Sequence, residues 1–101
     1  PALLRFGDLV IDSGAHRVTK AGAEVILTRR EFEILEFLAR HPGQVIPRDR
    51  FYNDLWGETI NVTERVIDTH IASLRRKLEN DPANPQLILS VRGMGYKLRT
   101  N

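Results

Sequence analysis

The chain has 101 residues, with 15 Lys and Arg against 13 Asp and Glu, a formal net charge of +2 and 42% apolar residues, which predicts a single domain with one small core and argues against wholesale disorder. No apolar run approaches the roughly 20 residues of a membrane span, and no signal-peptide pattern opens the chain, so transmembrane and secreted proteins are disfavoured. The sequence contains no cysteine, which excludes disulfides, thiolate nucleophiles and cysteine-based zinc sites and agrees with a cytoplasmic location.

The first quarter of the chain predicts an antiparallel sheet of three or four short strands. Four β-prone runs come in two pairs, and each pair is separated by a dipeptide in which glycine supplies the positive φ of a hairpin turn. The runs are Leu3–Phe6, Leu9–Asp12, Arg17–Lys20 and Ala23–Leu27.

The pattern changes to helical at Thr28. Thr28 followed by Glu31 forms a capping box, and Leu27 is placed to pack on Phe32 in a hydrophobic staple. Apolar residues then cover most of the circumference up to Arg40, which predicts a largely buried helix over 28–40. The sequence His41-Pro42-Gly43 ends it.

Two further helices are predicted. After an extended stretch at 44–46, Pro47 opens a short helix, although it lacks the side-chain oxygen of a Ser or Thr cap, and Gly57 ends it. A third helix is expected from about Thr63 to Glu79. Residues 81–86, with two prolines, are interpreted as a flexible connection.

A hairpin is predicted at the C-terminal end of the chain. Its strands are Leu87–Val91 and Tyr96–Arg99, and its tip is Arg92-Gly93-Met94-Gly95, where two glycines allow a tight, exposed turn.

The third helix carries most of the functional information. Four apolar residues at helical spacing form a stripe that is expected to face the core: Ile67, Ile71, Leu74 and Leu78. The opposite face carries small polar residues and arginines, a pattern suited to the major groove, where Arg forks onto guanine and small side chains permit close approach. An ordinary surface helix with Arg65–Asp68 and Arg76–Glu79 pairs is the competing interpretation.

The charge is unevenly distributed along the chain. Residues 1–64 carry 8 basic and 10 acidic side chains, whereas residues 65–101 carry 7 basic and 3 acidic ones. The basic C-terminal part is therefore the candidate surface for a polyanion. A sheet, three helices and a basic C-terminal hairpin together predict an α+β winged helix-turn-helix domain, in which the third helix reads bases and the hairpin reaches the neighbouring minor groove.

Four runs of residues carry a resemblance to a known family. They are Thr28-Arg29-Arg30-Glu31-Phe32-Glu33-Ile34-Leu35, Leu55-Trp56-Gly57, Arg65-Val66-Ile67-Asp68-Thr69-His70-Ile71 with Leu74-Arg75-Arg76-Lys77-Leu78, and Val91-Arg92-Gly93-Met94-Gly95-Tyr96. In this order and at this spacing, the chain resembles the DNA-binding effector domain of OmpR/PhoB-type response regulators, the output half of bacterial two-component systems with their phosphorelay. The resemblance spans nearly the whole chain.

The resemblance implies a role for each matching position. Residues expected to face DNA bases are Thr69, Ala72, Ser73 and Arg76. Residues expected to contact the DNA backbone are Arg65, as the phosphate anchor, together with His70, Arg75, Lys77, Trp56 and Tyr96. The wing residues expected in the minor groove are Arg92, Gly93 and Met94. Trp56 is also interpreted as an anchor in the core with its indole N–H at the rim.

The resemblance also implies partners. Relatives bind tandem direct-repeat half-sites head to tail, so we expect a monomer in isolation and a head-to-tail dimer on double-stranded DNA. The loop that in relatives touches RNA polymerase is matched by Glu58, Thr59, Ile60, Asn61 and Val62. The chain starts at Pro1, which indicates a piece of a longer protein. We therefore expect residues 1–101 to be the effector domain and the receiver domain to lie outside them.

Catalysis is disfavoured by the remaining chemistry. The histidines His16, His41 and His70 do not have metal-ligand spacing. The serines Ser13, Ser73 and Ser90 lack a nucleophile elbow, and no paired carboxylates stand in an apolar setting. No enzyme, metal or cofactor is expected. A winged helix that binds an acidic protein patch is the alternative, while an RNA-binding domain would need exposed stacking aromatics.

Overall fold

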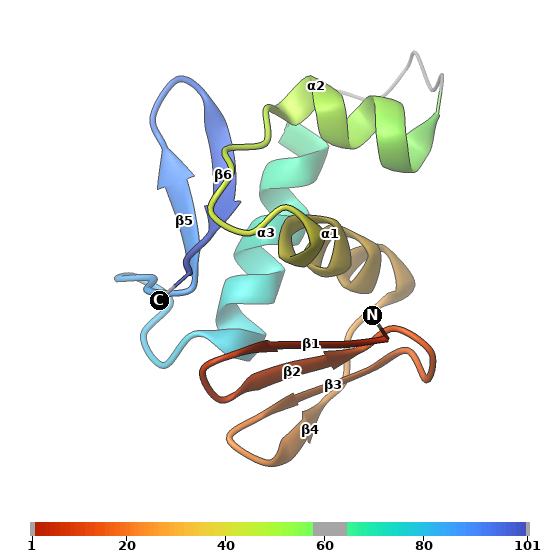
Figure 1. The fold of residues 1–101 in the computed structure, drawn as a ribbon. Helices are drawn as coiled ribbons and strands as arrows, with labels where there is room; N and C mark the ends of the chain where they lie inside the picture. The colour runs from red at the N-terminus through yellow and green to blue at the C-terminus, as the bar shows by residue number, and fades with distance from the viewer. Residues whose placement is uncertain (1, 58–64, 101) are drawn as a thin grey trace.

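The computed structural model describes residues 2–57 and 65–100, and Figure 1 shows how its elements are arranged. The N-terminal part is a four-stranded antiparallel sheet of order β1-β2-β3-β4. Its strands are β1 (Leu3–Phe6), β2 (Leu9–Asp12), β3 (Arg17–Lys20) and β4 (Ala23–Val25). The predicted sheet is confirmed, except that β4 ends two residues earlier than Leu27 because the chain turns there toward the first helix.

The remaining elements are helices and a hairpin. The helices are α1 (Arg29–Arg40), α2 (Arg48–Phe51), a π-helical turn η1 (Tyr52–Trp56) and α3 (Arg65–Leu78). The antiparallel hairpin consists of β5 (Ile88–Val91) and β6 (Gly95–Leu98). In Figure 1, α1 runs through the centre, with the N-terminal sheet below it, α3 behind it and the hairpin beside α3. This is the predicted winged helix-turn-helix arrangement.

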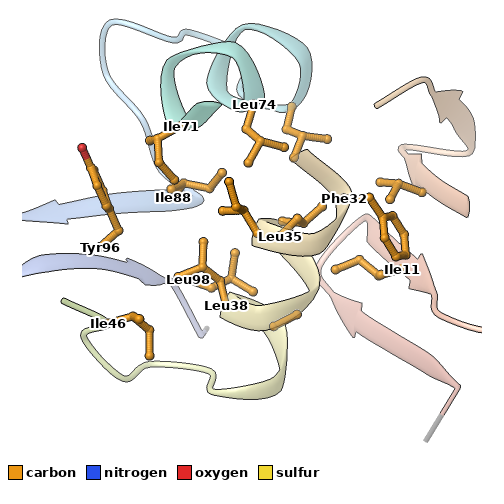
Figure 2. Close-up of a cluster of buried hydrophobic side chains, with 14 of the residues drawn as sticks. Ile11, Phe32, Leu35, Leu38, Ile46, Ile71, Leu74, Ile88, Tyr96 and Leu98 are labelled. Carbon is orange, nitrogen blue, oxygen red and sulfur yellow. The ribbon is translucent and has the colours of Figure 1, made fainter. Parts of the chain in front are cut away.

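A single core joins these layers. The apolar stripe of α3 is buried as predicted, with Ile67, Ile71, Leu74 and Leu78 between 0% and 2% exposed. It packs against α1, whose Leu35 lies at the centre of the cluster in Figure 2. Leu9, Ile11 and Val18 of strands β2 and β3 belong to the same core, and Ile88 and Leu98 of the hairpin complete it. Burial of this apolar surface fixes where the outer face of α3 points.

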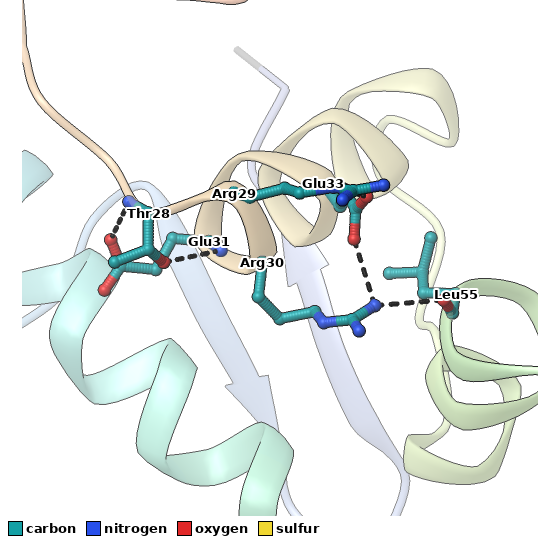
Figure 3. A network of polar contacts seen from close by, with 6 residues as sticks. All are labelled: Thr28, Arg29, Arg30, Glu31, Glu33 and Leu55. Atoms are coloured by element: carbon teal, nitrogen blue, oxygen red, sulfur yellow. Dashed lines mark hydrogen bonds and ion pairs between the residues drawn. The ribbon is translucent and has the colours of Figure 1, made fainter. Parts of the chain in front are cut away.

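The N-terminus of α1 has the predicted capping box. The Thr28 hydroxyl accepts a hydrogen bond from the Glu31 backbone N–H at 3.2 Å, and the Glu31 carboxylate accepts one from the Thr28 N–H at 2.9 Å (Figure 3). Because Thr28 is the cap, the helix proper begins at Arg29. Leu27 packs against the core cluster, of which Phe32 is a member.

The second helix is less regular than expected. Pro47 precedes α2 without a side-chain cap hydrogen bond, as its residue type predicts. After Phe51 the helix widens into η1, a single π-helical turn that the sequence pattern did not predict, and Gly57, at φ +70°, ends it. Residues 63 and 64 of the predicted third helix lie outside the described residues, and α3 ends at Leu78, one residue before the predicted end.

The connection between α3 and the hairpin is held by hydrogen bonds, which corrects the expectation of a flexible segment. The Glu79 carboxylate accepts hydrogen bonds from the backbone N–H groups of residues 86, 87 and 88. Asp81 accepts from the Ala83 backbone N–H and from the Asn84 side chain. A carboxylate that binds several N–H groups ties the end of α3 to the start of β5.

The hairpin is also joined to the segment before α2. Ile46 pairs with Tyr96 through two backbone hydrogen bonds, of 2.7 Å from the Ile46 N–H and 3.1 Å from the Tyr96 N–H. Gly95 therefore lies in a strand and is buried, not in the exposed turn where the sequence placed it. A Cβ at this position would lie 2.1 Å from the Ile46 carbonyl oxygen and 2.9 Å from the Pro47 Cα.

Within residues 2–57 and 65–100, no helix combines the length and the apolar character that crossing a bilayer requires.

We predict that Gly95→Ala lowers the free energy of unfolding by about 3 kcal/mol, because its methyl group must displace backbone atoms. Gly93→Ala is the matched control: Gly93 also has a positive φ, of +77°, but its Cβ would enter open space. Its cost is limited to a left-handed conformation, about 1 kcal/mol. Chemical denaturation of both variants measures the difference, and equal losses would contradict the close approach.

Candidate nucleic-acid interface

The outer face of α3 is exposed opposite the buried stripe. Thr69, Ala72 and Arg76 lie on this face, and all three are exposed to solvent. They are spaced by three and four residues, so they follow one side of the helix. The predicted base-facing residues Thr69, Ala72 and Arg76 are thus brought together on an accessible surface.

Of the two ion pairs in the ordinary surface-helix interpretation, Arg76–Glu79 is not formed, and Arg65–Asp68 involves a side chain outside the described ones. Glu79 binds backbone N–H groups instead, and Arg76 has no ion pair with any residue in the described parts of the chain. The Arg76 guanidinium therefore keeps its hydrogen-bonding capacity for an external acceptor.

Ser73 and Lys77, which the sequence predicts to face or contact DNA, are bound within the fold. The Ser73 hydroxyl donates a hydrogen bond to Glu31, and Lys77 Nζ lies 2.6 Å from Glu31 Oε1. Glu31 is 3% exposed. Burial alone would raise its pKa, but the bonds from Lys77, Ser73 and the Thr28 N–H lower the pKa to about 2. The two side chains expected to face or contact DNA are thus bound to an ionised, buried carboxylate of α1.

Arg75 joins α3 to the hairpin. Its Nε and Nη2 donate to the Ile88 carbonyl oxygen at 3.1 Å and 2.8 Å, and Nη2 also donates to the Ser90 hydroxyl at 2.8 Å. Arg75 is predicted to contact the DNA backbone, and in the structure its guanidinium holds β5 against α3. The helix and the wing are therefore coupled by a charge-assisted bond.

Tyr96 is likewise turned inward. It is 6% exposed, and its hydroxyl donates to Asp68 of α3, which also receives Arg48 Nε at 2.9 Å. Burial, followed by the hydrogen bond to Asp68, raises the pKa of the Tyr96 hydroxyl. The sequence assigned Tyr96 to a phosphate, whereas the structure uses its hydroxyl to join β6, α3 and α2.

Trp56 and His70 lie beside each other between η1 and α3. Their ring centroids are 6.0 Å apart, and the Arg30 guanidinium lies 4.2 Å from the centre of the Trp56 ring. Arg30 also donates to the Leu55 carbonyl oxygen at 3.0 Å (Figure 3). Burial lowers the pKa of His70, and the charge of Glu31 opposes this shift while that of Arg30 adds to it.

The tip of the wing is exposed at Arg92, Gly93 and Met94. Met94 is 60% exposed. Arg92 has no ion-pair partner among residues 2–57 and 65–100. Strands β5 and β6 thus present an arginine and a methionine at the end of a rigid hairpin.

For two predicted parts of the site, the side chains lie outside the described ones. Arg65 is the first residue of α3, and the proposed polymerase loop 58–62 lies outside the described residues.

Two important residues were missed by sequence reasoning in the roles they have here. Glu31 was read only as a helix cap, and Arg48 was given no role. The signal that could have pointed to Glu31 is a glutamate in the first turn of a helix that the sequence predicts to be largely buried. A carboxylate in such a position needs a cationic partner. Arg48 gave no signal, because its partner Asp68 lies 20 residues away.

In the part of the chain that is described, no three His, Cys, Asp or Glu side chains are grouped so as to hold a metal ion.

Comparison with known proteins agrees with this geometry. The family described as "Transcriptional regulatory protein, C terminal" matches residues 22–98. The DNA-binding response regulator MtrA of Mycolicibacterium smegmatis is 45% identical over 95 residues, which cover 94% of this chain and 42% of MtrA. The phosphate regulon transcriptional regulatory protein PhoB of Rhizobium meliloti is 43% identical over 98 residues, covering 97% of this chain and 43% of PhoB. The chain thus spans about two fifths of these curated relatives.

Solved structures are similar over nearly the whole chain. Response regulator DrrB, a Thermotoga maritima OmpR/PhoB homolog, has a TM-score of 0.90 and 38% identity over 97% of this chain and 44% of DrrB. The DNA-binding domain of Klebsiella pneumoniae RstA, in complex with the RstA box, has a TM-score of 0.89 and 34% identity over 98% of both chains. These similarities cover α3, the hairpin and the sheet alike.

Proposed function

The chain belongs to the family of C-terminal domains of transcriptional regulatory proteins of the OmpR/PhoB type, and from that premise we propose that it binds double-stranded DNA sequence-specifically to regulate transcription. The family consists of DNA-binding regulators and not of enzymes. One observation carries the proposal: the outer face of α3 exposes Thr69, Ala72 and Arg76 to solvent, while Ser73, Arg75 and Lys77 are bound to other elements of the fold.

In this proposal α3 lies in the major groove. Arg76 supplies a fork of donors suited to guanine, and Thr69 and Ala72 allow the helix to approach the base edges. Arg65 is proposed as a phosphate anchor at the start of α3, and Trp56 and His70, which lie beside each other, are proposed as further backbone contacts. The wing residues Arg92, Gly93 and Met94 enter the adjacent minor groove. Support for a DNA partner comes from relatives solved with DNA, the RstA and AdeR domains.

We propose that the rest of the protein supplies a receiver domain, since the curated relatives are more than twice as long as the matched region. A cytoplasmic location and a contact between loop 58–62 and RNA polymerase belong to the same proposal. The alternative of a protein-interaction module is not favoured, because the relatives are named for DNA binding.

Arg76→Ala is expected to cost about 1–3 kcal/mol on a preferred duplex and to relax the preference at particular base pairs, since the fork onto a base is lost. Arg65→Ala should instead weaken all sequences alike. Arg17→Ala, at an exposed arginine of β3, is the charge-matched control. Binding titrations on a selected duplex and on a scrambled one measure these effects. If Arg76→Ala weakened both duplexes equally, the base-reading role would be lost.

Arg92→Ala is expected to weaken binding more when the site is flanked by A·T tracts than by G·C, because a narrow minor groove concentrates negative potential. Folding should change by no more than about 0.5 kcal/mol, since Arg92 is an exposed turn residue. Equal affinity of mutant and parent on both flanks would remove the wing from the DNA interface and favour the protein-interaction alternative.

The isolated chain is expected to be a monomer that occupies two direct repeats about one helical turn apart, head to tail. Sedimentation with and without a two-site duplex measures this. A stable dimer without DNA, or a preference for inverted repeats, would contradict the head-to-tail arrangement.

A further inference from the structure

Glu31 connects α1 to α3 through its buried carboxylate. Its Oε1 accepts from Lys77 Nζ at 2.6 Å and from the Thr28 N–H at 2.9 Å, and its Oε2 accepts from the Ser73 hydroxyl. Figure 3 shows the Glu31 side chain turned from the N-terminus of α1 toward the neighbouring helix α3. Two residues one turn apart on α3 are thus held by one acidic group of α1.

The two side chains of the ion pair between Glu31 and Lys77 differ in how far they can move. The Glu31 side chain is 4% exposed and is fixed by its backbone hydrogen bond, whereas the Lys77 side chain is 34% exposed. Lysine carries its charge on a flexible four-carbon stem, so Lys77 can move into solvent when its partner is neutral, but Glu31 cannot leave its position. The position of Lys77 is therefore decided by the charge of Glu31.

Ser73 and Lys77 also border the exposed face of α3. They follow directly after Ala72 and Arg76 in sequence, on the side of the helix that turns toward α1. A lysine released there would stand beside the surface proposed to meet DNA. Because phosphate contacts are independent of sequence, an added cation at this place increases binding to every duplex.

We propose that Glu31 is a positioning residue that sets the specificity of DNA binding by withholding Lys77 and Ser73 from the DNA. The inference rests on the proposed function. In this arrangement Thr69, Ala72 and Arg76 are left to read the groove, and one cation at the edge of the helix is kept away from the phosphates. The low pKa of Glu31, about 2, keeps the carboxylate ionised throughout the neutral range.

The test compares four chains, the parent, Glu31→Gln, Lys77→Gln and the double variant, on a duplex selected from random sequences and on a scrambled duplex of the same composition. Affinity is measured as a function of salt, because the slope of log K against log salt reports the number of phosphates neutralised. Glutamine at position 31 still accepts from the Thr28 N–H, as glutamine does in capping boxes, so the start of α1 is preserved.

Lys77→Gln alone is expected to leave the salt slope of the parent unchanged, because Lys77 is bound to Glu31. Glu31→Gln should steepen the slope on the scrambled duplex by about 0.9, the contribution of one added phosphate contact. It should also reduce the ratio of selected to scrambled affinity. The double variant should restore the parental slope, which a merely structural role of Glu31 would not do.

Glu24→Gln is the matched control. It makes the same change of net charge and releases Arg17, whose Nη2 lies 3.4 Å from Glu24 Oε1, at the outer edge of the N-terminal sheet. Its salt slope should equal that of the parent.

Three results would overturn the inference. A Lys77→Gln variant whose slope is shallower by about 0.9 would mean that Lys77 already neutralises a phosphate in the parent. A folded Glu31→Gln variant with the parental slope and affinity ratio would mean that Glu31 withholds nothing. A slope for the double variant as steep as that of Glu31→Gln would assign the added contact to another group. If Glu31→Gln fails to fold, the Lys77→Gln slope decides alone. A parent without salt-dependent duplex binding would instead overturn the proposed function.

Discussion

The burial of one apolar stripe of α3 against α1 is the constraint on which the rest of the structure depends. Ile67, Ile71, Leu74 and Leu78 are withdrawn from water almost completely, and this fixes the rotation of α3 about its own axis. Once the rotation is fixed, Thr69, Ala72 and Arg76 have to point outward (Figure 2 shows the packed side). The functional surface is thus the complement of the core, and hydrophobic burial orients side chains that are themselves polar.

Polar contacts then divide the remaining side chains of α3 between the fold and the exterior. Three separate attachments hold the helix: Asp68 to Arg48 and Tyr96, Ser73 and Lys77 to Glu31, and Arg75 to the hairpin. Together they reach α1, α2 and both strands of the hairpin, so the helix is fixed along its length and not only around its axis. A rigid helix loses little conformational freedom on binding, which favours discrimination between sites.

The fold was largely predictable because its signals are local. The period of the α3 stripe, the capping box at Thr28 and Glu31, and the glycine turns all lie within a few residues of the structures that they specify. The division of the polar residues was not predictable, since Ser73 and Lys77 are 42 and 46 residues away from Glu31 in sequence. The burial of Gly95 was not predictable for the same reason, since its close neighbour Ile46 belongs to a distant segment of the sequence. In the candidate site, the residues predicted to face the bases at 69, 72 and 76 are exposed, whereas Arg75, Lys77 and Tyr96, predicted to contact the DNA backbone, have partners within the fold that the sequence pattern did not indicate.

The pairing of Ile46 with Tyr96 has a geometric consequence for the nucleic acid. The segment that leads into α2 and the strand that carries the wing share one hydrogen-bonded ladder, and Arg75 joins the same hairpin to α3. The helix α3 and the hairpin are therefore held at a fixed distance and angle to each other. In the proposed complex, the distance along the duplex between the bases read by the helix and the flank touched by the wing is then a property of the protein, and it cannot be adjusted to suit a target. An operator in which one base pair is inserted between these two points would present the flank rotated by about 34°, a tenth of a helical turn, and the proposed complex would then engage it with the helix or the wing but not both.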